Sequence, residues 1–261
     1  MKRCVRPMLV CLAAIFAAAP AMGEDLRPGI IGDDERMPVE ARGSPWDAIG
    51  QVNIGGYRQS GRCTGTLVAP DVVLTAAHCV IDRARNAPFP LHTIHFLAGA
   101  RRSGNKGHST AKCLHFLGDR DFTPPEPAGT ARPRPKLLLG ELHEDAALIV
   151  LNDRLAVDPA ALAGEAAARP EMSLVHVAYP ADRRYVLSAH QNCRLLRSPE
   201  GARLWFTDCD THPASSGGPV FVRTDGTLKL IAIMVATGDH RANIALPISR
   251  SAELTRARQC P

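Results

Sequence analysis

The feature that most limits the fold of this chain is a series of short, β-like apolar runs separated by Gly, Pro, Asn and Asp. Regularly spaced short strands with turn signals between them predict an all-β barrel architecture. A chain of 261 residues is long enough for one large all-β domain or two small ones. The expected strands form two groups: 48–54, 64–69, 72–75, 93–98, 111–117 and 146–151, then 173–178, 185–189, 204–207, 220–223, 228–236 and 243–245.

Three segments depart from this strand pattern. Residues 123–135 contain five prolines and are expected to form an extended surface loop. Residues 160–169 are rich in alanine and are expected to form a short helix between the two groups of strands. Residues 249–259 follow a serine that can cap a helix and carry basic residues late, which predicts a C-terminal helix.

Residues 1–23 have the pattern of a secretory signal peptide. Three basic residues precede an apolar stretch at 8–19, which is short for a membrane span, and residues 21 and 23 are small. A membrane anchor and a lipoprotein modified at Cys11 are the alternatives, although Leu9 and Val10 lack the small residue that lipoprotein processing needs. We therefore expect a secreted or periplasmic protein with no stable membrane insertion.

Removal of residues 1–23 leaves a small net charge. These residues hold three of the 31 basic residues and none of the 26 acidic residues, so the net charge falls from +5 to +2. A charge this small does not favour nucleic acid or an anionic membrane as a partner. The polar, Pro- and Gly-containing residues 24–45 that follow are interpreted as a propeptide or an N-terminal arm.

Six cysteines remain after the signal peptide. An even number of cysteines in an exported chain predicts disulfides, and six cysteines allow 15 connectivities. Cys193 and Cys209 flank two strand-like runs, 194–196 and 204–207, with a turn between them, and this arrangement favours a bond between the two. A metal site is the alternative, but the sequence lacks a short Cys-x-x-Cys or His/Cys cluster.

One serine, one histidine and one carboxylate stand in positions that suit nucleophilic catalysis. A serine hydroxyl needs a base within hydrogen-bond reach, and the base needs an orienting carboxylate. Ser216 precedes Gly-Gly-Pro, His78 lies in Thr-Ala-Ala-His-Cys, and Asp145 opens an apolar run. Ser215 is the rival nucleophile and Glu144 is the rival acid.

These motifs resemble those of the chymotrypsin-like (trypsin-like) serine proteases. The similar segments are residues 63–68 with 73–79, 145–148 and 216–219, in this order, and the resemblance extends over about 46–248. Residues 31–36 resemble the segment near the mature start of bacterial glutamyl endopeptidases, which are a secreted branch of the family.

The resemblance implies two six-stranded antiparallel β-barrels, at 46–158 and 159–261, with the active site in the cleft between them. It implies a serine endopeptidase that cleaves peptides or proteins through an acyl-enzyme without a metal or cofactor. Ser216 would be the nucleophile, His78 the general base and Asp145 the orienting carboxylate. The resemblance also pairs Cys63 with Cys79, which, with the pair at 193 and 209, leaves Cys113 and Cys260.

The chain departs from the family pattern around the nucleophile. The oxyanion hole should be formed by the backbone N–H groups of Ala214 and Ser216, but the family usually has glycine where Ala214 stands. The hole is then either imperfect or formed on substrate binding. Ser215 replaces the aspartate that receives the new N-terminal amine in trypsin-like zymogens, so we expect activation without that salt bridge.

The residues expected to contact the substrate give conflicting indications. Asp210 stands where trypsin-like enzymes select Arg or Lys, unless it belongs only to the local turn. Thr211 matches a threonine of the glutamyl endopeptidases, but Met234 occupies the position of their histidine. Val235 and Thr237 replace residues that usually line the pocket entrance, which favours a small or apolar side chain. A silent protease-like binding module and an esterase are the competing functions.

Overall fold

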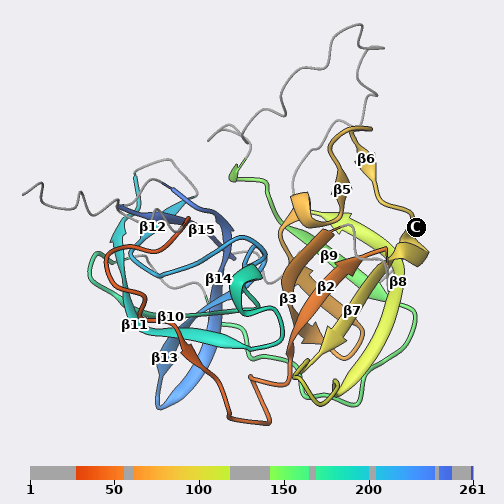
Figure 1. Cartoon of the computed structure of the whole chain (residues 1–261), viewed down its shortest axis with the longest axis horizontal. Helices are drawn as coiled ribbons and strands as arrows, with labels where there is room; N and C mark the ends of the chain where they lie inside the picture. Colours follow the sequence, from red (N-terminus) through yellow and green to blue (C-terminus); the bar gives the residue numbers. More distant parts are fainter. Residues whose placement is uncertain are drawn as a thin grey trace, which may run out of the picture.

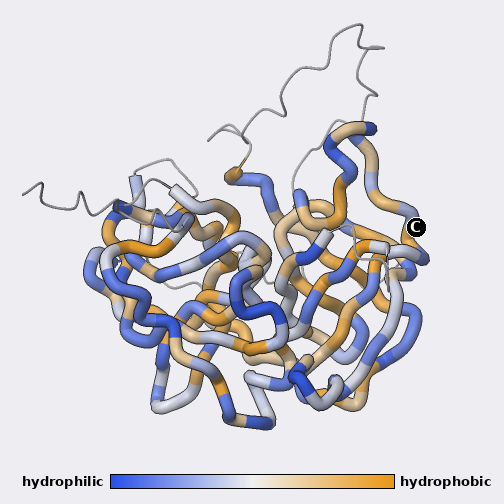
Figure 2. The backbone as a smooth tube through the Cα atoms, in the orientation of Figure 1, coloured by the Kyte–Doolittle hydropathy of each residue, from blue (hydrophilic) through white to orange (hydrophobic). Residues whose placement is uncertain are grey.

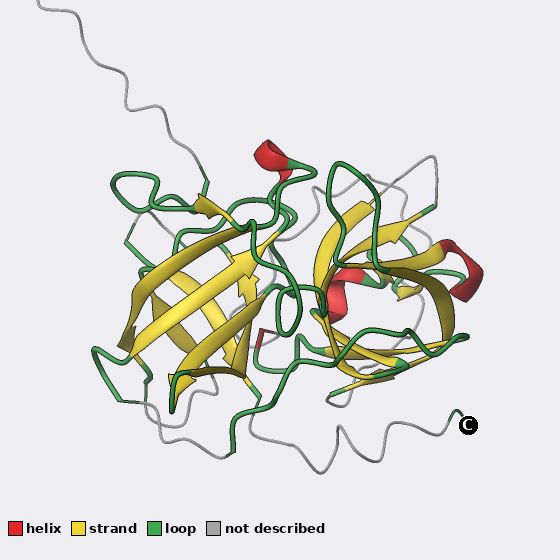
Figure 3. Cartoon of the chain, turned by 90° about the horizontal axis from the view of Figure 1, so that it is seen from below, coloured by secondary structure: helices red, strands yellow, loops and turns green. Residues whose placement is uncertain are grey.

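The structure is a computed structural model that describes residues 28–55, 61–117, 142–164, 169–199, 204–238, 241–248 and 260. In these ranges the chain forms two closed antiparallel β-barrels, which lie side by side (Figures 1 and 3). This arrangement confirms the predicted all-β fold with two six-stranded barrels. None of the helices in the described ranges has the length and apolar character needed to span a bilayer.

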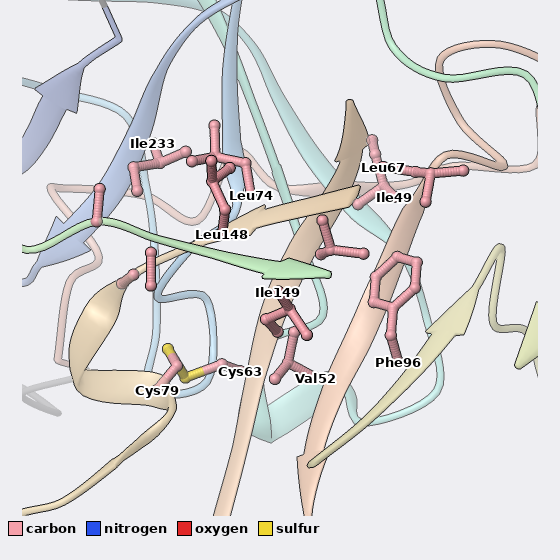
Figure 4. Packing of buried hydrophobic residues seen from close by; sticks show 14 of the residues in the cluster. Ile49, Val52, Cys63, Leu67, Leu74, Cys79, Phe96, Leu148, Ile149 and Ile233 are labelled. Atoms are coloured by element: carbon pink, nitrogen blue, oxygen red, sulfur yellow. A yellow bond between two sulfur atoms is a disulfide. The ribbon is translucent and has the colours of Figure 1, made fainter. Parts of the chain in front are cut away.

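The first barrel closes in the order β2-β3-β4-β9-β8-β7. Along β7 the side chains of Ile94, Phe96 and Ala98 are fully buried, whereas His95 and Leu97 between them are partly exposed. Alternate residues of a strand point to opposite faces, so this pattern fills the barrel interior (Figure 4). The strands of this barrel are β2 (Ile49–Ile54), β3 (Gly61–Ala69), β4 (Val72–Thr75), β7 (Ile94–Ala98), β8 (Gly107–Phe116) and β9 (Ala147–Leu151).

The second barrel closes in the order β11-β10-β13-β14-β15-β12, with β12 pairing back to β11. Apolar residues are concentrated along the strands of both barrels, and hydrophilic residues along the outer turns (Figure 2). The N-terminal arm adds a short strand, β1 (Met37–Pro38), to the edge of β11. The other strands are β10 (Ser173–Ala178), β11 (Ser188–Arg197), β12 (Trp205–Thr207), β13 (Pro219–Thr224), β14 (Thr227–Ala236) and β15 (Asn243–Pro247).

The short elements lie outside the barrels. A two-stranded hairpin of β5 (Ile81–Asp82) and β6 (Ala87–Pro88) follows the 3-10 helix η2 (Ala77–Cys79). Two further 3-10 helices, η3 (Leu91–Thr93) and η4 (Ala181–Arg183), lie before β7 and after β10.

The predicted helix at 160–169 is wrong where the structure describes that segment. Leu162 forms a parallel bridge with Leu230 of β14, and the N–H of Ala163 donates to the Leu230 carbonyl oxygen at 2.8 Å. Hydrogen bonding to a strand therefore outweighs the helix propensity of the alanines. The segments predicted to form a signal peptide (1–23), a surface loop (123–135) and a C-terminal helix (249–259) lie outside the described residues.

Three disulfides join the cysteines in the pairs that the sequence led us to expect. One lies within the first barrel region, one within the second, and the third connects β8 of the first barrel to the end of the chain. The bonds are Cys63–Cys79, Cys193–Cys209 and Cys113–Cys260, with sequence separations of 16, 16 and 147 residues. Disulfides are typical of proteins in oxidising compartments.

A fully buried tyrosine connects the two barrels. The hydroxyl of Tyr179, just after β10, donates to the carbonyl oxygen of Ala100 at 2.9 Å and accepts from Arg101 Nη1 at 2.8 Å. Burial raises the pKa of Tyr179. Gln51 of β2 adds a hydrogen bond to the carbonyl oxygen of Arg184 at 2.8 Å. These contacts fix the barrels relative to one another, as a site between them requires.

Candidate active site

His78 and Asp145 meet because β4 and β9 are neighbours in the first barrel. Thr75 at the end of β4 pairs with Ala147 at the start of β9, and η2 then turns His78 back toward the acid. Asp145 is fully buried. Its two carboxylate oxygens lie 2.6 Å from His78 Nδ1 and 2.8 Å from the His78 backbone nitrogen. A carboxylate held in this way fixes the orientation of an imidazole ring.

Ser216 lies on the turn that leads into β13, which we call the nucleophile turn (residues 214–219). The carbonyl oxygen of Ser216 accepts a hydrogen bond from Thr64 N–H of β3 at 2.9 Å, which ties this turn to the first barrel. Ser216 and His78 line the same cavity, of about 420 Å³. Among the described residues no hydrogen bond joins the two side chains, and such bonds are often long before substrate binds.

Ser215 does not share this cavity. It is buried, and its hydroxyl oxygen accepts the N–H of His212 at 3.3 Å, within the turn. Glu144 is half-buried and lies next to His143, 3.6 Å from its ring nitrogen, whereas the contact with His78 comes from Asp145. The geometry therefore distinguishes both rivals from the residues that converge on the cavity.

Ala214 has the backbone conformation that the family pattern reserves for glycine. Its φ angle is 74°, in the left-handed region, where an alanine costs about 1–2 kcal/mol. Among the described residues, neither Ala214 N–H nor Ser216 N–H makes a hydrogen bond, so both donors are free to meet a ligand. Two backbone N–H donors of this kind can form an oxyanion hole.

Four of the predicted substrate-binding residues line the cavity, and one does not. Thr211, Met234, Val235 and Thr237 are among its walls. Asp210 is fully buried outside the cavity walls, and burial raises the pKa of its carboxyl group. Further walls come from residues that the sequence did not single out, mostly next to the predicted ones: Arg83, Leu142, His212, Pro213, Ala236, Gly238 and Ile244.

The N-terminal arm forms hydrogen bonds with the carboxylate of Asp210. The backbone N–H groups of Ile31 and Glu35 donate to its two oxygens at 2.8 and 2.9 Å. The arm is held in place by Arg36, which is buried and pairs with Asp34 at 2.8 Å and with Asp182 at 2.7 Å. No local sequence pattern predicts these contacts, because Asp210 lies 179 residues from Ile31 and 175 residues from Glu35.

The ionisable groups of the arm are perturbed by these contacts. The side-chain hydrogen bond from Arg36 lowers the pKa of Asp34 to about 2. Asp182 also has a lowered pKa, because the hydrogen bond and charge of Arg36 outweigh the effect of burial. Both carboxylates therefore remain charged at neutral pH and hold the arm against the second barrel.

In the described part of the chain, the groups close enough to share a metal ion are already engaged. Two of the three clusters consist of disulfide cysteines with His78 or Asp208. In the third, Asp210 accepts two backbone N–H groups and His190 Nδ1 accepts the Asp210 N–H at 2.8 Å. His190 Nε2 lies 3.3 Å from Glu35, which gives that nitrogen a partner too.

Comparison with known proteins supports one family. A model of the trypsin-like peptidase domain matches residues 63–233, more than half of the chain. Among solved structures, a Glu endopeptidase in complex with MPD is similar over 88% of this chain and 99% of its own, with 19% identity and a TM-score of 0.66.

Two further proteases have similar structures. The thermostable serine protease AL20 from an extremophilic microorganism matches over 81% of this chain and 95% of its own, with 18% identity and a TM-score of 0.57. The Vibrio cholerae VesB protease matches over 88% of this chain and 67% of its own, with 16% identity and a TM-score of 0.59. At these identities the likeness establishes a common fold.

Proposed function

Because the chain belongs to the trypsin-like peptidase family, we propose that it is an exported serine endopeptidase that cleaves peptide bonds through an acyl-enzyme. The observation that carries this proposal is the pair of contacts from Asp145 to His78, at 2.6 and 2.8 Å, beside a cavity that His78 shares with Ser216. An imidazole oriented by a buried carboxylate is the base that a serine hydroxyl needs.

In each half of the proposed reaction His78 first takes a proton and then returns it. Ser216 Oγ attacks the carbonyl carbon of the scissile bond while His78 takes its proton, and the N–H groups of Ala214 and Ser216 receive the oxyanion. His78 then gives the proton to the leaving amine, and an acyl group remains on Ser216. Water attacks this ester with His78 again as the base, the acyl–oxygen bond breaks, and His78 returns the proton to Ser216 Oγ as the carboxylic acid leaves.

Labelling by a fluorophosphonate tests the assignment of the nucleophile. We expect the wild-type protein and Ser215→Ala to be labelled, and Ser216→Ala to lose the label. Equal labelling of wild type and Ser216→Ala would refute the proposal. Two observations in the described ranges favour a silent binding module instead: no hydrogen bond joins His78 to Ser216, and Ala214 is strained. Turnover of an unfolded casein-like substrate at pH 8 distinguishes a peptidase from this binding module and from an esterase.

We further propose that the substrate side chain before the scissile bond is small or apolar. The walls of the cavity include Met234, Val235 and Ile244, and Asp210 is engaged by the N-terminal arm instead of facing the cavity. Mass spectrometry of a digested peptide library should show cleavage after small or apolar residues. A dominant preference for Arg and Lys would contradict this assignment.

The proposed export and activation concern the start of the chain. We propose that residues 1–23 are removed as a signal peptide and that activity does not depend on a new N-terminal amine. The arm contacts Asp210 through the backbone N–H groups of Ile31 and Glu35, so these contacts do not require a free amine. Activity that appears only when an Ile30 or Ile31 amine is created, and is lost when that amine is blocked, would count against it.

A further inference from the structure

The conformation of Ala214 needs a feature that holds it. Of the five non-glycine residues with positive φ in the described ranges, three are Asn or Asp, whose side chains can form local hydrogen bonds. Alanine has no such side chain. Strain at a residue of this kind persists only where the surrounding structure determines it, and such residues cluster at functional sites.

The hydroxyl group of Thr64 supplies that support. Thr64 is fully buried in β3, and its Oγ1 lies 3.1 Å from the carbonyl oxygen of Ala214. Thr64 Oγ1 also accepts a hydrogen bond from the backbone N–H of Tyr179 at 3.0 Å. A hydroxyl has one proton, and because Tyr179 already acts as the donor to Oγ1, that proton is available for Ala214.

The peptide between Ala214 and Ser215 is held at both of its polar groups. The Ala214 carbonyl oxygen accepts from Thr64, and the Ser215 N–H donates to the carbonyl oxygen of His212 at 2.9 Å. A return of Ala214 to negative φ has to rotate this peptide or the preceding one, which carries the Ala214 N–H. The Thr64 bond fixes the peptide between Ala214 and Ser215. The preceding peptide, which carries the Ala214 N–H, therefore keeps its orientation only while the Thr64 bond is present.

We propose that Thr64 is a positioning residue of the oxyanion hole, whose hydroxyl holds Ala214 in the left-handed conformation in place of the conformational freedom of a glycine. The proposal rests on the proposed function of this site. Thr64 contacts both donor residues, since its N–H also binds the Ser216 carbonyl oxygen at 2.9 Å. One residue therefore contacts both donor residues, Ala214 through its hydroxyl group and Ser216 through its backbone N–H.

The test is a double-mutant cycle on kcat and KM with a peptide substrate. Thr64→Val, which has nearly the same shape but no hydroxyl, should lower kcat by about 10–100-fold, below the full loss of about 10²–10³-fold for one oxyanion donor. KM should change less than threefold, because the interaction is made in the transition state. Thr64→Ser retains the hydroxyl and should stay within about threefold of wild type.

Ala214→Gly gives the discriminating arm, because glycine adopts positive φ without strain. The variant Thr64→Val/Ala214→Gly should regain kcat to within about threefold of Ala214→Gly alone. The resistance of the double variant to urea should stay below that of Ala214→Gly, because the Tyr179 N–H still lacks the acceptor that Thr64 Oγ1 provides. If Thr64 has a merely structural role, glycine at position 214 should not restore kcat. That result would overturn the proposal.

The outcomes for this proposal and for the proposed function are separable. A wild-type protein that is not labelled at Ser216 contradicts the peptidase assignment itself. A labelled, active wild type in which Thr64→Val retains the wild-type kcat contradicts only the role of Thr64.

Discussion

Two glycines with the same backbone conformation offer a matched test of how the nucleophile turn is packed. Gly217 has φ of +76° and Gly226, in the turn between β13 and β14, has φ of +75°. A Cβ added at Gly217 would lie 2.2 Å from Thr75 Oγ1 and 2.3 Å from the Thr64 carbonyl oxygen, whereas Gly226 has open space. The two substitutions share the backbone strain and differ in the clash.

The expected magnitudes follow from these distances. Left-handed strain of about 1–2 kcal/mol, partly offset by about 0.4–1 kcal/mol from a less flexible unfolded chain, should make Gly226→Ala destabilising by about 1 kcal/mol. At Gly217 the neighbours must also move by about 1 Å to reach ordinary contact. Overpacking of this kind adds about 1–3 kcal/mol, and a 1 Å displacement of Ser216 should slow catalysis by about 10²-fold.

Urea unfolding followed by tryptophan fluorescence gives the stability, and the rate of fluorophosphonate labelling reports the placement of Ser216. We expect Gly217→Ala to unfold at lower urea and to label about 100-fold more slowly than Gly226→Ala. A Gly217→Ala protein that matches Gly226→Ala in both measurements would refute the packing argument.

Three further predictions concern other contacts. Tyr179→Phe should lower the free energy of unfolding by about 1–3 kcal/mol through loss of its interbarrel hydrogen bonds, while Tyr185→Phe, at a half-exposed site, should not; equal urea curves would contradict this. The Asp34 carboxylate, with its pKa held near 2, stabilises the fold above its unfolded pKa of about 4, and this stabilisation is lost as the pH falls toward 2. Asp34→Asn should therefore flatten the loss of urea resistance between pH 4 and pH 2, and an unchanged slope would speak against the pairing with Arg36. Asp145→Asn should lower kcat by about 10⁴-fold with the fold retained, since an amide does not fix the imidazole tautomer; a loss below tenfold would exclude its proposed role.

Local pattern was sufficient for most of the strands. The predicted strands at 72–75 and 173–178 have the same bounds as β4 and β10, because a short apolar run and the turn signals that flank it act within a few positions. The runs at 185–189 and 194–196 are instead parts of one strand, β11, which starts at Ser188. The pairing of β11 with β10, which includes one register shift, decides this, and no local pattern encodes that partner.

Long-range contacts explain the other differences. The alanine-rich segment at 160–164 is extended because β14 offers it hydrogen bonds. Asp210 matched a family position at the pocket base, yet its partners are backbone N–H groups of the arm, which carry no residue-specific signal. The same reasoning applies to Thr64, whose hydroxyl contacts Ala214 at a separation of 150 residues.

The disulfide between Cys113 and Cys260 closes a covalent ring that contains the whole second barrel and the last strands of the first. It closes a loop of 147 residues that begins in β8 and passes through the whole second barrel. In the chain-entropy model such a closure disfavours the unfolded chain by about 5 kcal/mol. A single cut in the connection between β9 and β10 would leave the halves attached until the bond is reduced. A single cut in that connection should therefore separate the two parts of the molecule only when this bond is also reduced.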